Sequence, residues 1–527
     1  MVNKLDQLGD SAKAYMPGDH LGRPIGDNDG EWMPFVDWGE VYAGNRTKDR
    51  FGQFGLFDSP LGISVKVEEA SVSDPILTTE EPWEQSGGLL PLSAWTENGE
   101  CHMLYRTHGT AYARSNDGYN WERPNMDQIP FDGSTNNNLV CGEVVGTVVD
   151  DPESNPNERY KAMMEVGGMY DAESGEPLKG DDGLDRLKAL SYEGYDYKGA
   201  GLILTARIRG YTSPDRLHWN VIKEPIGDMP SDGTGANPEY DQETKTYFAY
   251  LRVHGLPPTE LKGLSGNPAE LTISRRAIGL SRTKDFHHWP PPKLVLFPDA
   301  LDPADTSFYG GFYFKYPHRK DLHCMLVHVM HQATGNVDTQ IAFSSDGIIW
   351  NRPERSPIIP TGKVGTGYEG TIYPQGGFVE LPDGHWAVPF CGGSTLHNGF
   401  THGNPDVSPK QLRWARWSPH RVCGIQADHE GRFTIGTVRR SKNQLKLNYR
   451  CNAGGWIKAE IIGAVPSRIY PDTPVLPGFS FDDCDWITGD SSDQTITWQG
   501  KSDISSVGNT VAIRIKMFNA KVFAYQI

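Results

Sequence analysis

The sequence predicts an all-β protein, with a five-bladed β-propeller over residues 59–430 followed by a C-terminal β-sandwich over residues 431–527. Three observations predict this fold class. A turn motif containing Asp and Trp recurs along the chain, five polar hairpins each open into an alternating apolar strand, and the strand pattern changes near Gly431. The chain has 59 Gly and 38 Pro residues, and no long stretch keeps the 3.6-residue period of a helix.

The turn motif has the pattern Ser/Thr-x-Asp-x-x-x-Trp. It occurs four times, as SNDGYNW (115–121), SPDRLHW (213–219), TKDFHHW (283–289) and SSDGIIW (344–350). We expect each Asp side chain to cap a turn by accepting hydrogen bonds from the backbone that follows, and each Trp to begin the next strand and pack between repeats. The aspartates of the motif are therefore predicted to be structural and not catalytic; they are Asp117, Asp215, Asp285 and Asp346.

Each repeat also contains a polar hairpin that leads into an apolar strand. The hairpins are ENGE (97–100), NPNE (155–158), DQETK (241–245), HRKD (318–321) and PDGH (382–385), and the strands after them are HMLYR, YKAMM, YFAYLR, HCMLVHV and WAVPF. Five such units predict five blades. The fifth unit has the strand QLRWARW but no Asp turn, so we expect the segment GISVKVEEASV (62–72) to complete this blade and close the ring.

The two ends of the chain differ from the repeats. Residues 1–58 are rich in loop-forming residues and are predicted to wrap the propeller. From Gly431 onward the strands alternate without the Asp turn; they are LKLNYR, GWIKAEII, QTITWQG, TVAIRIKMF and AKVFAYQI. This pattern predicts a separate antiparallel sandwich.

Composition excludes several classes of partner. A net charge of −17 leaves nothing to offset repulsion from a phosphate backbone, so no nucleic-acid partner is expected. No segment approaches the ~18 apolar residues of a membrane span, so no membrane partner is expected. The N-terminus lacks the apolar core of a signal peptide, which predicts a cytoplasmic protein or one written here without its export signal. The seven scattered cysteines predict reduced core thiols. The oligomeric state is not predicted.

Several segments resemble a group of predicted glycosidases that are similar to glycoside hydrolase family 32. These segments span most of residues 60–527; they are LYRTHGTAYARSNDGYNWERP, STNNNLV, DDPESNPNERYKAM, DTSFYGGFYFKYP, IAFSSDGIIWNRP, LNYRCNAGGWIKAEI, PGFSFDDCDWITGD, TWQGKSD and NAKVFAYQ. The related five-bladed families act on fructosides, arabinosides and xylosides. The resemblance therefore implies a sugar-processing enzyme with two or three carboxylates on inner strands around a funnel on the propeller axis.

The sequence departs from the fructosidases in one respect that matters for the site. The Trp-Met-Asn-Asp-Pro-Asn-Gly block is absent, because the nearest phrase, GEWMPFVDWGE, lacks the Asn-Asp-Pro core. Neither an Arg-Asp-Pro nor a Glu-Cys-Pro element occurs. Catalytic residues therefore cannot be transferred by motif.

Glycoside hydrolysis needs two carboxyl groups across the scissile bond. Polar residues stand near the start of each predicted inner strand, where packing between blades does not require them; they are Glu84, Glu143, Asn237, Glu239, Asp302, Asp305 and Glu369. Glu369, in a glycine-rich strand start, and Asp305 are the predicted catalytic pair, with Glu84 as a third, orienting acid. Asp305 precedes the aromatic stretch FYGGFYF, where Tyr309 suits stacking on a sugar. Glu143 and Asn237 are predicted to bind substrate.

A Tyr-(Leu)-Arg-x-His-Gly element occurs at the ends of equivalent strands in two repeats. It places Arg106 and His108 in LYRTHG, and Arg252 and His254 in YLRVHG. Because arginine offers a bidentate fork, two such pairs around an axis could hold a carboxylate or sulfate of the substrate. The alternative is that both arginines pair with structural acids at blade edges.

No metal or other cofactor is predicted. His328 and His331 lie one odd step apart in a strand and face opposite sides, which favours core or edge histidines over a shared metal site. A structural Ca²⁺ held by loop carboxylates remains an open alternative. The glycine-rich loop FCGGSTLHNGFTHG (390–403) is predicted to form a rim that brings His397 or His402 over the funnel.

Three functions are consistent with these features, and all have a carbohydrate partner. The first is a glycoside hydrolase acting on a terminal furanose or similar small sugar through paired carboxylates. The second is a lyase on uronates, with His108 or His254 and a tyrosine as acid and base, and arginine neutralising the carboxylate. The third is a lectin-like propeller without turnover, which predicts exposed Trp residues on a rim.

Overall fold

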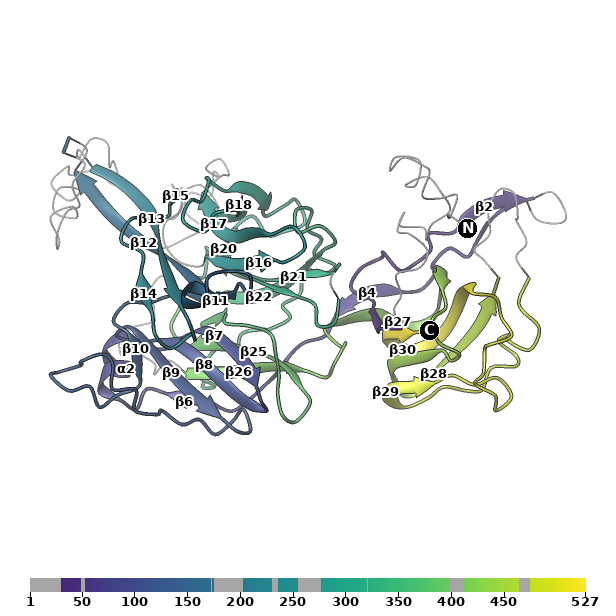
Figure 1. The fold of residues 1–527 in the computed structure, drawn as a ribbon. Helices are drawn as coiled ribbons and strands as arrows, with labels where there is room; N and C mark the ends of the chain where they lie inside the picture. Colours follow the sequence, from purple (N-terminus) through teal and green to yellow (C-terminus); the bar gives the residue numbers. More distant parts are fainter. Residues whose placement is uncertain are drawn as a thin grey trace. The chain divides into compact units, whose positions relative to one another are not determined.

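Almost all of the regular secondary structure in the described part of the chain is β-strand (Figure 1). The computed structural model describes residues 30–48, 53–171, 173–174, 202–229, 236–254, 276–319, 321–397, 411–463 and 474–527. Within these ranges helix is confined to α2 (Pro82–Gly87) and a 3-10 turn at Pro156–Glu158. The protein is therefore nearly all-β, as the sequence predicts. None of the helices in the described ranges is long and apolar enough to cross a membrane.

The chain divides into two compact units. The larger unit comprises residues 69–416, and the smaller one comprises residues 1–68 together with 417–527. The sequence placed the second boundary at 430/431, but this point falls inside the single strand β27 (Cys423–Arg439). Residues on both sides of Gly431 pair with the same neighbouring strand, so the whole of β27 belongs to the smaller unit.

The first part of the larger unit contains three antiparallel sheets. The first sheet has the order β10–β9–β8–β7, with β7 Leu90–Glu97, β8 Glu100–Arg106, β9 Thr110–Ser115 and β10 Leu139–Cys141. The second is β11–β12–β13–β14 with β15 beside β13, and comprises Thr147–Asp150, Tyr160–Asp171, Leu202–Ser213, Asn220–Val221 and Gly227–Met229. The third is β16–β17–β18–β19, and comprises Asn237–Asp241, Thr246–His254, Arg276–Thr283 and Lys293–Leu296.

The rest of the larger unit is one continuous hydrogen-bonded sheet. Its first half is β20 (Thr306–Lys315), β21 (His323–His331) and β22 (Val337–Ser344). A single parallel bridge, Val337 to Thr371, joins this half to a second half. The second half comprises β23 (Thr371–Pro374), β24 (Val379–Glu380), β25 (Trp386–Gly393) and β26 (Gln411–Trp417).

The N-terminal segment expected to close the last repeat does so only with its end. Two short strands, β5 (Ser71–Val72) and β6 (Leu77–Thr78), pair with β26. The preceding strand β4 (Ser64–Val67) pairs instead with β27 in the smaller unit. The segment 62–72 is therefore shared between the two units, because both have an edge strand whose backbone needs a partner.

The Asp motif forms a capped turn, as the sequence predicts. Asp117 accepts hydrogen bonds from the backbone N–H groups of Tyr119 and Asn120, both at 2.7 Å. These bonds outweigh burial and hold the pKa of Asp117 well below its ordinary value. The Trp121 indole donates to the carbonyl of Gly118 at 3.0 Å and closes the turn. Asp215 and Asp346 also accept two such backbone bonds each, and Asp285 accepts one. The indoles of Trp219 and Trp289 close their turns in the same way, whereas the indole N–H of Trp350 has no hydrogen-bond partner in the described part of the chain.

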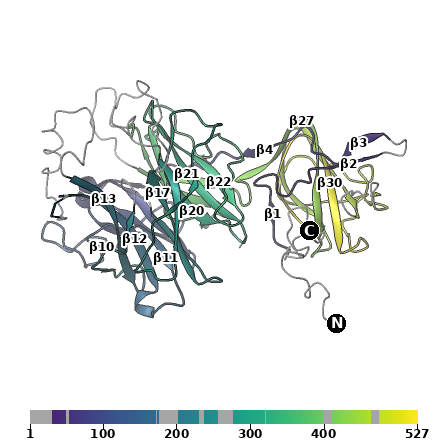
Figure 2. The ribbon, with the colours of Figure 1, turned by 90° about the horizontal axis from the view of Figure 1, so that it is seen from above.

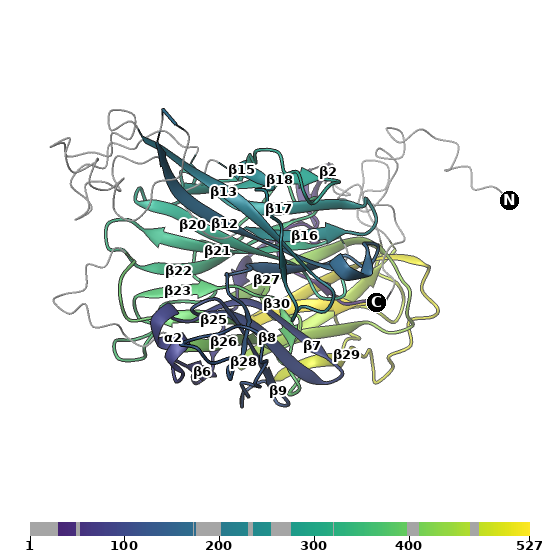
Figure 3. The same cartoon turned by 60° about the vertical axis from the view of Figure 1, so that its left-hand side comes forward.

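Buried side chains pack each sheet of the larger unit against the next. One cluster joins β8 and β9 to β12 and β13, another joins β13 to β17, and a third joins β17 and β18 to β20 and β21. Figure 3 shows the long hairpin β12–β13 beside β16 and β17. The last strand packs on the first sheet, where the buried indole of Trp414 donates to the carbonyl of Gly118 at 2.7 Å. The succession of packed sheets thus returns to its beginning.

The smaller unit is built on three long strands. Its sheet has the order β29–β28–β30–β27–β4, with β28 at Lys446–Ile462, β29 at Asp490–Thr495 and β30 at Thr510–Gln526. The N-terminal strand β1 (Met33–Pro34) pairs with β30, and β2 (Asn45–Lys48) forms a hairpin with β3 (Phe54–Phe57) (Figure 2). The described part of residues 1–58, predicted to wrap the propeller, is therefore a component of the smaller unit.

Candidate functional site

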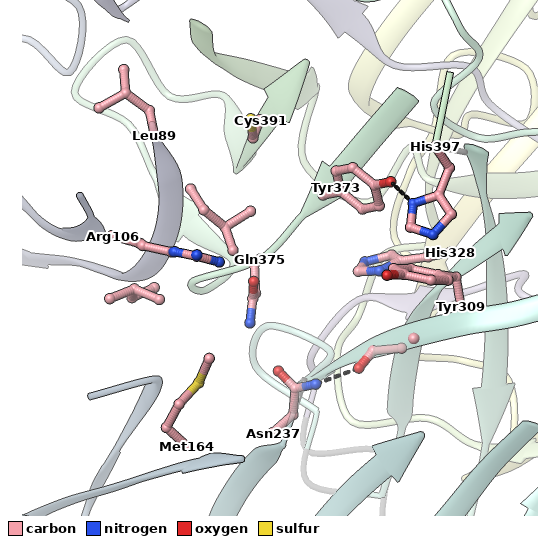
Figure 4. A pocket seen from close by; sticks show the side chains of 14 residues that line it. Leu89, Arg106, Met164, Asn237, Tyr309, His328, Tyr373, Gln375, Cys391 and His397 are labelled. Atoms are coloured by element: carbon pink, nitrogen blue, oxygen red, sulfur yellow. Dashed lines mark hydrogen bonds between the residues drawn. The ribbon is translucent and has the colours of Figure 1, made fainter. Parts of the chain in front are cut away.

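A cavity of about 250 Å³ lies in the larger unit, and every sheet of that unit contributes to its wall. We refer to it as the central cavity. Strands β7 and β8 contribute from the first sheet, β12 from the second, β16 from the third, and β20, β21, β23 and β25 from the remainder (Figure 4). The lining residues are Leu89, Leu90, Leu92, Arg106, Met164, Asn237, Tyr309, Gly310, Gly311, His328, Tyr373, Gln375, Cys391 and His397.

Strand β20 is shaped to bring a phenol and an imidazole to the cavity. Its pairing with β21 shifts register between Phe308 and Gly310, so that Tyr309 is an extra residue in the ladder. A Cβ atom at Gly310 would lie 3.0 Å from Nδ1 of His328. Glycine at this position therefore leaves room for the His328 ring against β20.

Arg106 enters the cavity from the end of β8 and points toward Gln375 (Figure 4). In the described part of the chain, neither the guanidinium of Arg106 nor the side-chain amide of Gln375 has a hydrogen-bond or ion-pair partner. Both side chains are only partly buried. A positive charge and a neutral amide are thus available to a ligand, and together suit a carboxylate or another oxyanion.

Tyr309 lies on the opposite side of the cavity from Arg106 (Figure 4). The Arg252 guanidinium stacks over its ring at 4.2 Å and donates to its backbone carbonyl at 2.9 Å. The Arg276 guanidinium lies 5.4 Å from the same ring centroid, and the His397 ring lies 4.2 Å from it. The hydroxyl of Tyr309 has no hydrogen-bond partner among the described residues. Two cations are therefore placed to stabilise negative charge that develops on this phenol.

His328 is a buried imidazole, and one of its two ring nitrogens makes a hydrogen bond within the protein. Burial lowers the pKa of His328 to about 4, and the positive charge of Arg252 acts in the same direction. The ring is therefore neutral near neutral pH. Its Nε2 lies 2.9 Å from the carbonyl oxygen of Pro374, which can only accept, so Nε2 carries the proton. Nδ1 is then an unprotonated acceptor, on the side of the ring that faces Gly310.

Two further polar side chains of the lining, those of Tyr373 and Asn237, already make hydrogen bonds within the protein. The hydroxyl of Tyr373 lies 3.0 Å from Nδ1 of His397, and burial raises the pKa of Tyr373. The Asn237 amide donates to the carbonyl of Gly311 and accepts from the hydroxyl of Thr147 at 3.3 Å. Asn237 thus ties neighbouring sheets together while it lines the cavity.

The predicted substrate-binding residues separate into two groups. Arg106, Asn237 and Tyr309 line the cavity, and Arg252 is buried behind Tyr309. His108 is exposed outside the lining and packs on Phe131 with ring centroids 5.2 Å apart. The side chain of His254 lies outside the described residues.

The predicted carboxylates do not line the central cavity. Glu84 is fully buried at the start of α2, where it accepts from the hydroxyl of Tyr105 at 2.7 Å and from Nε of Arg123 at 2.8 Å. It also accepts from the backbone N–H groups of residues 80 and 81. These contacts give Glu84 a structural role as a helix cap and ion-pair partner.

The other predicted carboxylates are partly exposed and accept hydrogen bonds from within the protein, but only Glu369 binds its own loop. Glu369 accepts from the N–H groups of Gly365 and Gly367 at 3.1 and 2.8 Å. Burial acts to raise the pKa of Glu369, but these backbone bonds outweigh it and lower the pKa. Asp305 accepts from the N–H of Ala333 at 3.1 Å. Glu143 accepts from Arg209 at 3.0 Å and from Tyr211 at 2.8 Å.

Three cavity residues with polar side chains have no role in the site that the sequence predicts: His328, Tyr373 and Gln375. The spacing of His328 favours a core or edge histidine. His397, one of two histidines that the rim loop is expected to bring over the funnel, does line the cavity, and His402 lies outside the described residues. The signal that could have found His328 is the Gly310–Gly311 pair, because glycine in a strand marks a close approach. His331 faces the other side of β21, as its spacing predicts, and bonds Asp338 at 2.7 Å.

The described residues contain no group of three or more His, Cys, Asp or Glu side chains placed to hold a metal ion. The seven cysteines are free thiols, and all but Cys451 are buried.

No family model matches the chain, and no curated protein matches its sequence. Among solved structures it is similar to a thermostable family-43 glycoside hydrolase, with 13% identity over 64% of this chain and 92% of that chain and a TM-score of 0.38. It is also similar to an α-L-arabinofuranosidase from Podospora anserina in complex with cellotriose, with 11% identity over 67% and 98% of the two chains and a TM-score of 0.37. A β-1,2-mannobiose phosphorylase from Listeria innocua matches at 16% identity over 79% and 95%, with a TM-score of 0.29. With scores below 0.5, these likenesses identify neither a family nor an activity for this chain.

Proposed function

We propose that the larger unit is a five-bladed β-propeller with the central cavity on its axis, and that the smaller unit is a β-sandwich. Three sheets and the two halves of the fourth account for five blades. Support comes from the packing, because each sheet contacts the next and the last strand returns to the first sheet. It also comes from the cavity, to which every sheet contributes.

We further propose that the protein is a carbohydrate-active enzyme that uses β-elimination to cleave the glycosidic bond joining a neighbouring sugar to O4 of an acidic sugar. The observation that carries this proposal is the partnerless Arg106 guanidinium, which faces Tyr309 and His328 across a cavity whose described lining contains no carboxylate. The resemblance of the sequence to predicted glycosidases supports a carbohydrate substrate. The volume of about 250 Å³ is below the ~300–1,000 Å³ of pockets for drug-sized ligands, and suits one sugar unit.

In the proposed elimination, each polar residue of the cavity has a separate role. Arg106 and Gln375 bind the carboxylate at C5 of a uronate and stabilise the charge that spreads onto it when the neighbouring proton leaves. Tyr309, whose ring lies beside the guanidiniums of Arg252 and Arg276, acts as the general base that removes the C5 proton. The C5 electron pair forms the C4–C5 double bond while the C4–O4 bond breaks, and Tyr309 returns the proton to O4. His328 accepts a hydrogen bond from a sugar hydroxyl through Nδ1.

Hydrolysis by the predicted pair Glu369 and Asp305 is a second candidate, and one observation favours it. Both acids contact the turn between β21 and β22: Asp305 accepts from the N–H of Ala333, and Asn336 donates to the carbonyl of Glu369 at 3.4 Å. Two residues with partly exposed carboxyl groups thus contact the same turn. The lowered pKa of Glu369 keeps it ionised, as a nucleophile or base requires. In this candidate mechanism Asp305 takes the role of the acid.

One substitution pair separates the two mechanisms. Tyr309→Phe keeps the ring on which the two guanidiniums stack and removes only the hydroxyl. On uronate-containing oligosaccharides we expect the wild-type protein to release unsaturated products that absorb in the ultraviolet, and Tyr309→Phe to reduce their rate of formation by about 100-fold or more. Glu369→Gln should retain the elimination activity.

The opposite result supports the hydrolase: saturated reducing sugars from the wild type, activity retained in Tyr309→Phe and lost in Glu369→Gln. A third outcome is that the oligosaccharides tested bind without forming either unsaturated products or saturated reducing sugars. In that case the protein is a binding propeller and both enzyme proposals fail.

A further inference from the structure

An exposed aromatic corner lies on the smaller unit. Trp486 is 65% exposed, and within the described part of residues 417–527 it is the only large hydrophobic side chain that is exposed. Trp456, which is half-buried in β28, meets it with ring centroids 5.3 Å apart and ring planes at 90°. We call this pair the tryptophan corner. It borders a shallow depression lined also by Cys451, Asn452, Ala453, Gly454, Gly455, Thr488 and Gly489.

The corner is held rigidly from beneath. Trp456 stacks on Phe518 of β30 at 6.4 Å and 16°. The Lys458 ammonium lies 4.4 Å from the Trp486 ring centroid and also donates to the carbonyl of Phe481 at 3.0 Å, which fixes it under the ring. A ring that is already immobilised loses little conformational entropy when a ligand binds to it.

The floor of the depression is free of side chains because of glycine. The pairing of β28 with β30 shifts register between Cys451 and Trp456, and the extra residues form a glycine-containing bulge. Cβ atoms built on Gly454 and Gly489 meet no atom within 4 Å, so these positions border open space. The depression therefore exposes backbone groups, the Asn452 amide and the Thr488 hydroxyl beside the indole rings.

The depression is too small for a protein interface. A stable protein partner buries about 800 Å² per side around an apolar core, whereas only two indoles are available in this corner. Neither indole N–H has a hydrogen-bond partner in the described part of the chain. An apolar ring face next to donors and acceptors matches a pyranose, which has an apolar C–H face and a rim of hydroxyls.

We propose that the tryptophan corner is a second carbohydrate-binding site, which holds a neutral stretch of polysaccharide by stacking a sugar on Trp486. Neutral sugar is favoured over a polyanion because exposed Asp482 and Asp485 stand close to Trp486 in the chain, and Lys516 is paired with Glu430 at 3.1 Å. The proposal goes beyond the activity proposed for the central cavity and does not depend on its chemistry.

Affinity electrophoresis of the full chain tests the site. The gels contain arabinan, xylan, galactan, mixed-linkage glucan or polygalacturonate. We expect the wild-type protein to be retarded by at least one neutral polysaccharide, and Trp486→Ala to weaken that binding about tenfold or more. Trp486→Tyr, which keeps an aromatic face, should retain most of it. Trp38→Ala, which removes another exposed Trp of the same unit, should bind like the wild type.

The proposal is overturned if none of the neutral polysaccharides retards the wild type, or if Trp486→Ala and Trp38→Ala are retarded equally. It is also overturned if Trp486→Ala changes the molecular mass in solution, because the corner would then be a contact between copies of the chain. Tyr309→Phe should bind as the wild type does, so failure of the cavity proposal and failure of this one give different results.

Discussion

At the scale of single residues, the cavity wall includes a histidine, His328, that is buried in its neutral form. His328 is neutral because the cost of burying a charged imidazole exceeds the gain from its bond to the carbonyl of Pro374. The neutral state leaves Nδ1 as an acceptor, which an imidazolium would not offer. The stability of the protein should therefore depend on pH through this residue.

The sign of that dependence follows from proton binding. The pKa of His328 is about 4 in the folded protein against 6.5 ordinarily, so the unfolded chain binds more protons between these values. The free energy of unfolding should rise with pH across this window and fall on acidification through it, by on the order of 3 kcal/mol. We expect His328→Gln, which keeps a donor for Pro374, to lose this contribution to the pH dependence in denaturant unfolding.

His108→Gln is the matched control, because His108 is exposed and lies outside the cavity lining. It should unfold with the same pH dependence as the wild type. If His328→Gln keeps the wild-type dependence as well, His328 is not the group that titrates.

The sequence points to cavity-lining residues where a residue type is unusual in its position, but not where burial determines which side chains reach the cavity. An arginine at the end of an inner strand and a tyrosine in FYGGFYF are conspicuous, and Arg106 and Tyr309 do line the cavity. His328 and Gln375 have no sequence signal of their own, because their access to the cavity depends on strands far away in the chain. The acids were chosen for their chemistry, and Glu84 shows that a carboxylate in such a position can be fully committed to structure.

At the scale of elements, α2 is a six-residue helix whose geometry depends on a buried charge. Glu84 caps it, bonds Tyr105 and pairs with Arg123 at 2.8 Å. Removal of one partner of a buried pair leaves the other charge uncompensated. We expect Glu84→Gln to lower the free energy of unfolding by about 3 kcal/mol in chemical denaturation.

Glu80→Gln provides the comparison, since Glu80 pairs with the same Arg123 but is 63% exposed. It should change stability by less than about 1 kcal/mol. In the folded fraction Glu84→Gln should keep its catalytic rate. A folded and stable Glu84→Gln protein without activity would show that Glu84 takes part in catalysis.

Elements were predicted well where the pattern is local. The Asp turns are visible in the sequence because a side chain and a backbone only a few residues apart determine them. Pairing partners are less visible. Nothing local distinguishes Ser64–Val67 from Ser71–Val72, yet the first pairs in the smaller unit and the second in the larger one. Long-range pairing is decided by which edge is free, and the sequence does not state it.

At the scale of the whole molecule, Trp414 couples the last long strand of the larger unit to its first sheet. This buried indole lies in the last long strand and bonds the first Asp turn at Gly118. We expect Trp414→Leu to cost about 3 kcal/mol. Hydrogen–deuterium exchange should then rise together in β7–β9 and in β23–β26, because both sheets lose the same contact.

Trp498→Leu is the corresponding change in the smaller unit, where Trp498 is equally buried and bonds the carbonyl of Ala459 at 3.0 Å. Its exchange should rise within the smaller unit and leave β7–β9 unchanged. If hydrogen–deuterium exchange in Trp414→Leu rises only in β26, Trp414 does not couple the last strands to the first sheet.

The sequence by itself determined the all-β class and the capped turns, because these depend on alternation and on contacts between residues a few positions apart. It also singled out Arg106 and Tyr309, which line the central cavity. Only the tertiary structure decided which strand completes which sheet, and where the two units divide. It also decided that the described wall of the cavity is made of arginine, phenol, imidazole and amide groups while the expected carboxylates lie elsewhere. The physical reason is that a cavity wall is assembled from strands of every sheet, and burial, not sequence position, determines which side chains remain without partners.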